Sequence, residues 1–238
     1  MCRLFGAISN SGIPEEVITQ FIDLAENGKI GADFGCGNDK TRGHKDGWGV
    51  AALGDKKIYY REGIAATQSN QIHRVVKEID SMEKVRMIMH LRRASDRNTI
   101  SPENAHPFCL VHERREYYFA HNGSIVNYNP IIHGNIIDSE YLFRNLIAMI
   151  DGGLISSVEN LRRKVDYTAL NFLLLSENEI YAYRDAKKCV DYFTLYFATR
   201  ENLHIICSEK LDLPGFKWKK MKNPSLLRLT EKGFGAMI

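Results

Sequence analysis

The chain has 238 residues, of which 44% are hydrophobic and 26% are charged, and its formal net charge is +3. This length and apolar content suit one domain with a sizeable core, and so small a net charge gives no support for nucleic acid as a partner. A run of about 18 apolar residues is absent, and Cys2, Arg3 and Gly6 interrupt the place where a signal peptide has its apolar segment. We therefore expect a single domain, residues 1–238, that resides in the cytoplasm and not in a membrane.

The cysteines are odd in number and lack the paired spacing of a zinc site. They are Cys2, Cys36, Cys109, Cys189 and Cys207. An odd number argues against a disulfide framework and is consistent with a reducing compartment. We therefore predict no metal site and no cofactor, with at least one free thiol.

Apolar runs predict many strands, and helical periodicity is confined to a few segments. In chain order, the predicted elements are a strand at residues 3–9, a helix between Pro14 and Gly28, a loop at 29–47, strands at 48–53 and 57–61, a weak helix at 70–79, a strand at 85–91, a loop at 94–107, strands at 108–112 and 116–120, helices at 138–150 and 158–165, and strands at 169–175, 179–184, 193–199, 203–207 and 226–229. This pattern favours an α+β layered domain with two sheets and outer helices over an alternating βαβ fold.

Cys2 follows the initiator methionine, so removal of Met1 would place a thiol and a free α-amine on one residue. Such an amine titrates at about 7.7 to 8.0 and a thiol at about 8.5, so the amine can accept the proton of the thiol. This arrangement predicts acyl transfer through a thioester, and the alternative is a cysteine that packs as a small apolar residue. With Met1 attached, the Cys2 nitrogen is an amide and the molecule should be inert.

Three further stretches carry groups that an acyl-transfer site needs. Asn122 and Gly123 follow a strand and can hold a tetrahedral oxyanion, although Asn-Gly is also a common turn. Arg92 ends a strand and suits bidentate binding of a carboxylate. Asp138 precedes a predicted helix, where it can act as an N-cap, meet a substrate ammonium group, or do both.

The order of these segments resembles the class II glutamine amidotransferases of the N-terminal-nucleophile hydrolase superfamily. The matching segments are Cys2-Arg3-Leu4-Phe5-Gly6, Gly43-His44-Lys45-Asp46-Gly47-Trp48-Gly49, His90-Leu91-Arg92-Arg93-Ala94-Ser95, Asn104-Ala105-His106-Pro107-Phe108, Ala120-His121-Asn122-Gly123, Asp138-Ser139-Glu140 and Cys207-Ser208-Glu209-Lys210-Leu211. Each segment alone is a modest signal, but the ordered set is highly specific. The closer match is to the short, stand-alone branch of the family.

The resemblance implies a four-layer αββα sandwich with two mainly antiparallel sheets and with Cys2 as the nucleophile after removal of Met1. It also implies that Asn122 and Gly123 form the oxyanion hole. Arg92 is then expected to bind the α-carboxylate of glutamine, and Asp138 its α-amine.

Other positions are expected to shape the pocket. Ser95 matches a hydroxyl position near the carboxylate, and the loops that contain His44 and His106 frame the substrate pocket. Because the terminal amine supplies the base in this family, we expect His44, His90, His106 and His121 to be structural. Arg93 departs from the family, whose synthase-linked members often have Trp at this position. The resemblance therefore does not predict how this wall of the pocket is formed.

Three functions are compatible with these residues. The first is hydrolysis of glutamine to glutamate and ammonia through a Cys2 γ-glutamyl thioester, and the second is hydrolysis of a γ-glutamyl peptide or conjugate by the same nucleophile. The third is a non-catalytic glutamine-binding regulatory module. An ammonia-accepting synthase, if one exists, is expected to be a separate chain that docks at an exposed apolar or glycine-rich mouth of the pocket.

Overall fold

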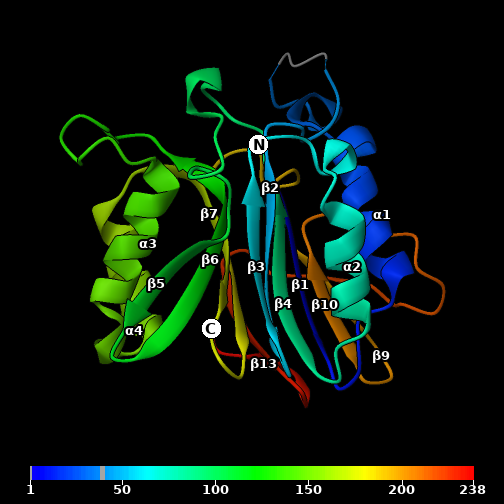
Figure 1. Cartoon of the computed structure of the whole chain (residues 1–238). Helices are drawn as coiled ribbons and strands as arrows, with labels where there is room; N and C mark the ends of the chain where they lie inside the picture. Colours follow the sequence, from blue (N-terminus) through cyan, green and yellow to red (C-terminus); the bar gives the residue numbers. More distant parts are fainter. Residues whose placement is uncertain (1, 38–40) are drawn as a thin grey trace.

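The computed structural model describes residues 2–37 and 41–238 as four layers, with two antiparallel sheets between two pairs of helices (Figure 1). Met1 and part of the loop predicted at residues 29–47 lie outside the described residues. The layers confirm the predicted αββα architecture. Among the described residues, none of the helices combines the length and apolar character needed to cross a membrane.

The first sheet has seven strands in the order β11-β9-β10-β1-β4-β2-β3. Their bounds are β1 Arg3–Ser9, β2 Trp48–Gly54, β3 Lys57–Glu62, β4 Val85–Leu91, β9 Tyr196–Arg200, β10 Leu203–Cys207 and β11 Lys219–Lys220. The strand β1 lies near the middle, between β10 and β4, and all seven of its residues are buried. Its uninterrupted apolar run is therefore explained by burial on both faces.

The second sheet has six strands in the order β13-β12-β8-β7-β6-β5. Their bounds are β5 Phe108–His112, β6 Arg115–Ile125, β7 Tyr167–Leu175, β8 Ile180–Arg184, β12 Ser225–Thr230 and β13 Gly233–Ala236. The short strands β11 and β13 were not predicted, and β6 runs five residues past its predicted end at Ala120. The Asn122-Gly123 pair is thus part of a strand and is not a turn.

Two helices cover each sheet on its outer face (Figure 1). The helices α1 Glu15–Asn27 and α2 Ile72–Asp80 pack on the first sheet, and α3 Asp138–Ala148 and α4 Leu154–Lys164 pack on the second. Aromatic rings anchor both layers, with Phe5 and Phe21 at 5.1 Å between ring centroids and Phe119 and Phe143 stacked at 5.0 Å.

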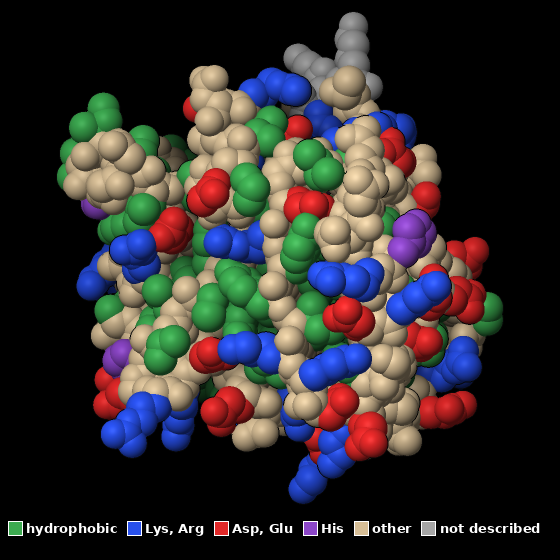
Figure 2. Space-filling model, in the orientation of Figure 1, with side chains coloured by type: hydrophobic (Ala, Val, Ile, Leu, Met, Phe, Trp, Pro, Cys, Tyr) green, Lys and Arg blue, Asp and Glu red, His purple; other side chains and the backbone are tan. Residues whose placement is uncertain are grey.

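The sheets pack on each other through a third apolar core that includes Leu4, Ile8, Leu173 and Ile206. Figure 2 shows hydrophobic side chains between the β5 and β3 edges, with Lys, Arg, Asp and Glu around them. The ion pair of Lys57 on β3 with Glu116 on β6, 2.9 Å long, joins the two sheets.

A disulfide between Cys36 and Cys189 joins segments 153 positions apart, with a Cα–Cα distance of 5.8 Å. This pair contradicts the expectation, drawn from the odd cysteine count, that the chain has no disulfide framework. The free thiols are those of Cys2, Cys109 and Cys207. The spacing of cysteines along the chain holds no information on this pair, because only the fold brings them together.

Candidate active site

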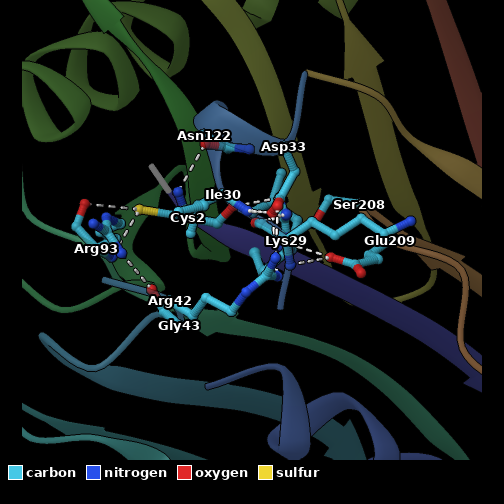
Figure 3. Close-up of polar contacts among 12 residues, drawn as sticks. Cys2, Lys29, Ile30, Asp33, Arg42, Gly43, Arg93, Asn122, Ser208 and Glu209 are labelled. Carbon is cyan, nitrogen blue, oxygen red and sulfur yellow. Dashed lines mark hydrogen bonds and ion pairs between the residues drawn. The ribbon is translucent and has the colours of Figure 1, made fainter. Parts of the chain in front are cut away.

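Cys2 lies where β1 begins and β4 ends. The two strands are antiparallel, and Arg3 pairs with Leu91, the last residue of β4. The residues that follow β4 are therefore held beside the thiol. The amide N–H of Arg93 donates a hydrogen bond to Cys2 Sγ at 3.4 Å, and the thiol donates one to the Arg93 carbonyl oxygen at 3.7 Å (Figure 3).

The segment after β10 anchors the start of β1 from the other side. The Leu4 N–H donates to Ser208 Oγ at 2.9 Å, and Arg3 Nε pairs with Glu209 at 3.0 Å (Figure 3). Both partners belong to the segment at residues 207–211 that resembles the family pattern. That segment therefore supports the strand that carries the nucleophile.

Asn122 extends from the second sheet toward the same point. The Cys2 N–H donates to Asn122 Oδ1 at 3.0 Å (Figure 3). Asn122 is only 1% exposed, and its Nδ2 has no acceptor among the described residues. A buried amide donor without an acceptor is costly, so the position calls for a ligand oxygen.

Gly123 lies at an irregularity in the β6–β7 ladder, where the register shifts between Gly123 and Ile125. A Cβ at Gly123 would lie 1.8 Å from the carbonyl oxygen of Ala169. The close approach of the two backbones therefore requires glycine. Bulges of this kind commonly redirect a strand beside an active site.

Arg92 is 4% exposed, and its guanidinium is held by Thr99. Nη1 donates to the Thr99 carbonyl at 3.0 Å, and Nη2 donates to Thr99 Oγ1 at 2.8 Å. Burial lowers the pKa of Arg92, while the charges of Cys2, Asp46 and Asp138 act in the opposite direction. Guanidinium stays protonated in proteins, so Arg92 presents a fixed cation.

Backbone contacts connect the Gly43–Gly49 segment to the turn after β4. The Asp46 N–H donates to the Arg92 carbonyl at 3.0 Å, and the Arg92 N–H donates to the Gly47 carbonyl at 2.7 Å. Asp46 Oδ2 accepts from the Ala94 N–H at 2.9 Å. Two segments far apart in sequence thus fix one turn beside the thiol.

Asp138 is the first residue of α3, and Ile137 occupies the N-cap position. Its Oδ2 accepts from the Ile125 N–H at 3.0 Å, and its Oδ1 accepts from the Ser139 N–H at 2.8 Å. A carboxylate in the first helical turn is stabilised by the helix dipole. The side chain is thus held between the end of β6 and the start of α3 instead of acting as the N-cap.

Cys2, Arg92, Gly123 and Asp138 line one cleft of about 610 Å³, whereas Asn122 and Asp46 are not part of its lining. Its lining includes Cys2, Arg92, Arg93, Ser95, Thr99, Asn104, His106, Gly123, Tyr128, Ile136, Ile137 and Asp138. A fixed cation and an anion therefore share the cleft with a thiol. The groups suit a zwitterionic amino acid end and an acyl group that reacts with sulfur.

Three buried histidines lie next to the cleft, and burial lowers the pKa of each. The rings of His90 and His106 are 4.2 Å apart. His121 Nε2 lies 3.3 Å from the Ala169 carbonyl, and Nδ1 lies 2.8 Å from Ser139 Oγ. Because a carbonyl can only accept, Nε2 carries the proton and Nδ1 accepts from Ser139.

The remaining expected pocket residues divide into two groups. Ser95 and His106 line the cleft. His44 does not reach it, because the fully buried ring packs at the end of α1, where its Cδ2 would lie 2.9 Å from a Cβ at Gly28. Thr99 was missed, since its role depends on a loop contact that no local pattern encodes.

A possible cation site among the described residues lies outside the cleft. Ligand atoms of His112, Glu113 and Asp151 are within 4.8 Å of one another. His112 Nε2 already bonds to Asp151 Oδ1 at 2.9 Å, which accounts for their proximity without an ion. The cluster therefore gives no argument for a metal.

Comparison with known proteins shows the family of this chain. The family model for class II glutamine amidotransferases matches residues 1–204. YafJ of Escherichia coli (strain K12) is 27% identical over 148 residues, which cover 60% of this chain and 52% of YafJ. The chain spans about half the length of the curated relatives it matches.

Solved structures share the fold at low identity. The glutamine phosphoribosylpyrophosphate amidotransferase of B. subtilis has a TM-score of 0.68 and 16% identity, and the match covers 99% of this chain and 48% of that one. The glutamine aminotransferase class-II domain protein SPO2029 of Silicibacter pomeroyi has a TM-score of 0.58 and 16% identity, and the match covers 98% and 97% of the two chains.

The fold is that of the N-terminal-nucleophile amidotransferases. The chain belongs to the class II glutamine amidotransferases, because the family model covers most of its length.

Proposed function

We propose that the protein hydrolyses the side-chain amide of glutamine, with Cys2 as the nucleophile once Met1 has been removed. The observation that carries this proposal is the meeting of Cys2, Arg92, Gly123 and Asp138 in one cleft, with Asn122 in contact with the Cys2 nitrogen. The residues come from separate parts of the chain, so their convergence is not a consequence of local sequence. A cation and an anion match the α-carboxylate and the α-amine of the substrate.

The first step is formation of the γ-glutamyl thioester. The α-amine of Cys2 accepts the proton of the thiol, and the thiolate attacks the amide carbon. Asn122 Nδ2 and the Gly123 N–H stabilise the oxyanion, and the amine returns the proton to the leaving nitrogen, which departs as ammonia. The carboxamide of Asn122 does not have to rotate for this role. Its Oδ1 keeps the contact with the Cys2 nitrogen, and its Nδ2 is available to donate to the oxyanion.

The second step consumes water. The α-amine of Cys2 takes a proton from the water, which attacks the thioester carbon, and the same two donors hold the second oxyanion. Collapse releases glutamate and regenerates the thiol. No histidine is needed as a base, in keeping with the lowered pKa values of His90 and His106.

Replacement of Cys2 tests the proposal. We expect Cys2→Ala to abolish ammonia release, while Cys109→Ala, which removes a half-buried thiol on β5, retains it. Ammonia release is measured with glutamine after mass spectrometry has verified the N-terminus. Activity in Cys2→Ala would refute the assignment, and a persistent Met1 with bound glutamine would favour a regulatory module.

The size of the cleft favours a second candidate, a γ-glutamyl peptide or conjugate as substrate. About 610 Å³ lies within the range of sites for ligands larger than one amino acid, and Tyr128, Ile136 and Ile137 add apolar lining. The glutamyl end would bind Arg92 and Asp138 in the same way. A product assay that compares glutamine with γ-glutamyl peptides separates the two substrates.

An ammonia-accepting synthase remains a proposed partner. The loop after β6 borders the cleft and exposes Val126, Ile131 and Ile132, the last two by 82% and 74%. Exposed apolar side chains at the mouth of a cleft suit a docking partner. If Ile131→Ser with Ile132→Ser leaves ammonia transfer to every candidate synthase unchanged, this loop is not the docking site.

A further inference from the structure

The disulfide lies on a segment that contacts two residues beside Cys2, one adjacent in the sequence and the other adjacent in space. This segment, residues 29–43 without the undescribed residues 38–40, is called the bridged segment here. It begins after α1 and contains the short 3₁₀ helix Gly31–Phe34, and Cys36 follows that helix. Cys189 lies between β8 and β9 in a left-handed backbone conformation, with φ of 49°. The bond cross-links the bridged segment to the connection between β8 and β9.

Arg3, the residue after Cys2, contacts the bridged segment directly. Its Nη2 donates to the Lys29 carbonyl, and its guanidinium lies 4.9 Å above the ring of Tyr192. The Lys29 N–H and Arg3 Nε both bind the carboxylate of Glu209 at 3.0 Å (Figure 3). Arg3 is fully buried, so a shift of Lys29 leaves a buried charge with fewer partners.

Arg93, whose backbone contacts the thiol, binds the other end of the same segment. Its Nη1 donates to the carbonyls of Thr41 and Gly43, each at 2.8 Å. Figure 3 shows Cys2 between these two sets of contacts, with Arg93 and Gly43 on one side and Lys29 and Glu209 on the other. The bridged segment therefore contacts Arg3 at one of its ends and Arg93 at the other.

The two ends of the disulfide are packed and still reachable. The Tyr192 N–H donates to the Cys189 carbonyl at 2.9 Å, and the Tyr192 ring meets Phe34 edge-on at 5.5 Å. Phe34 and Val190 are exposed, and both cysteines are half-buried. An exogenous thiol can therefore approach the bond, whereas a structural disulfide deep in a core would be protected.

We propose that Cys36–Cys189 is a redox modification site, whose reduction by a dithiol releases the bridged segment and slows the nucleophile. A thiolate of the dithiol attacks one sulfur of the bond, which releases the other cysteine and forms a mixed disulfide. The second thiol of the dithiol then attacks this mixed disulfide and releases the first cysteine. Cys36 and Cys189 leave as two thiols, and the dithiol becomes a disulfide, so two electrons and two protons pass to the protein. In a reducing compartment such bonds are mostly transient and redox-sensing. The activity readout of this proposal rests on the proposed hydrolysis.

The test compares bridged and reduced enzyme with the double variant Cys36→Ser and Cys189→Ser. Blocking of free thiols followed by mass spectrometry first measures the fraction that is bridged. Dithiothreitol should lower kcat/KM for glutamine by about tenfold in the native protein, and the double variant should show the lower value with or without dithiothreitol. Because the variant retains Cys2, its failure to respond separates the bridge from redox chemistry of the nucleophile.

A second readout does not depend on hydrolysis. Reduction should speed tryptic cleavage after Arg42, in the bridged segment, by about tenfold in both the native protein and Cys2→Ala, and not in the double variant. The proposal is overturned if bridged and reduced enzyme differ by less than about twofold in both readouts, or if oxidised protein yields no Cys36–Cys189 bond. Faster cleavage without any glutamine hydrolysis would retain the redox site and reject the proposed reaction instead.

Discussion

At the residue scale, Arg92 shows how a side chain prepared by its neighbours becomes a binding group. Its place could be predicted, because it follows a buried strand and residues at strand ends reach the rim. The geometry of its guanidinium could not, since Thr99 holds it through two hydrogen bonds from a loop seven residues later. Because these two hydrogen bonds already fix the guanidinium, Arg92 loses less side-chain rotation on binding than a free arginine would.

The substitution Arg92→Lys tests this orientation, because it keeps the charge and removes the planar fork. We expect KM for glutamine to rise by about 10- to 100-fold, which corresponds to the loss of a charged hydrogen bond of about 1.5–3 kcal/mol, with a smaller effect on kcat. Steady-state kinetics on the processed enzyme measures both parameters. Arg97→Lys, an exposed position on the same loop, is the matched control and should leave KM unchanged. An unaltered KM in Arg92→Lys would remove Arg92 from the binding site.

At the element scale, β6 decides how the second sheet contributes to the cleft. The sequence predicts a strand that ends at Ala120, whereas the ladder with β7 continues to Ile125. Asn122 and Gly123 are predicted to follow the end of this strand, with a turn as the alternative, and the structure instead keeps them within β6 and buries His121 and Asn122. Periodicity could not predict this, because the hydrogen-bond partners of these side chains, Ser139 and Cys2, lie in other parts of the chain.

Gly123→Ala tests the close approach of β6 and β7. Since the new Cβ would lie 1.8 Å from the Ala169 carbonyl, we expect the free energy of unfolding to fall by about 1–3 kcal/mol and ammonia release to fall more than tenfold. Urea unfolding and the ammonia assay measure the two effects. Gly152→Ala is the control, because no heavy atom lies within 4 Å of its added Cβ. Equal stability of the two variants would contradict the packing argument.

At the scale of the whole molecule, buried histidines from different layers make the free energy of unfolding depend on pH. His90 is the last residue but one of β4 in the first sheet, and His121 belongs to β6 of the second sheet. The ring of His106 packs edge-on against that of His90. Burial lowers all three pKa values below the ordinary value of about 6.5. The folded protein therefore holds these side chains neutral where the unfolded chain would protonate them.

Below pH 6.5 we accordingly expect the free energy of unfolding to decrease as pH falls, since the unfolded chain binds more protons than the folded one. Each histidine contributes up to about 1.4 kcal/mol per pH unit, and above pH 6.5 the contribution disappears. Urea titrations between pH 5 and 7.5 measure the slope. His106→Asn should make the slope shallower, and a slope identical to that of the native protein would contradict the buried neutral state of His106.

The sequence by itself determined the strands and helices whose periodicity reports burial, such as β1 and α1, and it determined the family through the order of short segments from Cys2 to Asp138. Only the tertiary structure decided the contacts between distant segments: the Thr99 hold on Arg92, the placement of His44 away from the cleft, and the Cys36–Cys189 bond. The physical reason is that local patterns encode which face of an element is apolar, whereas hydrogen bonds and disulfides depend on distances that the packed layers alone set.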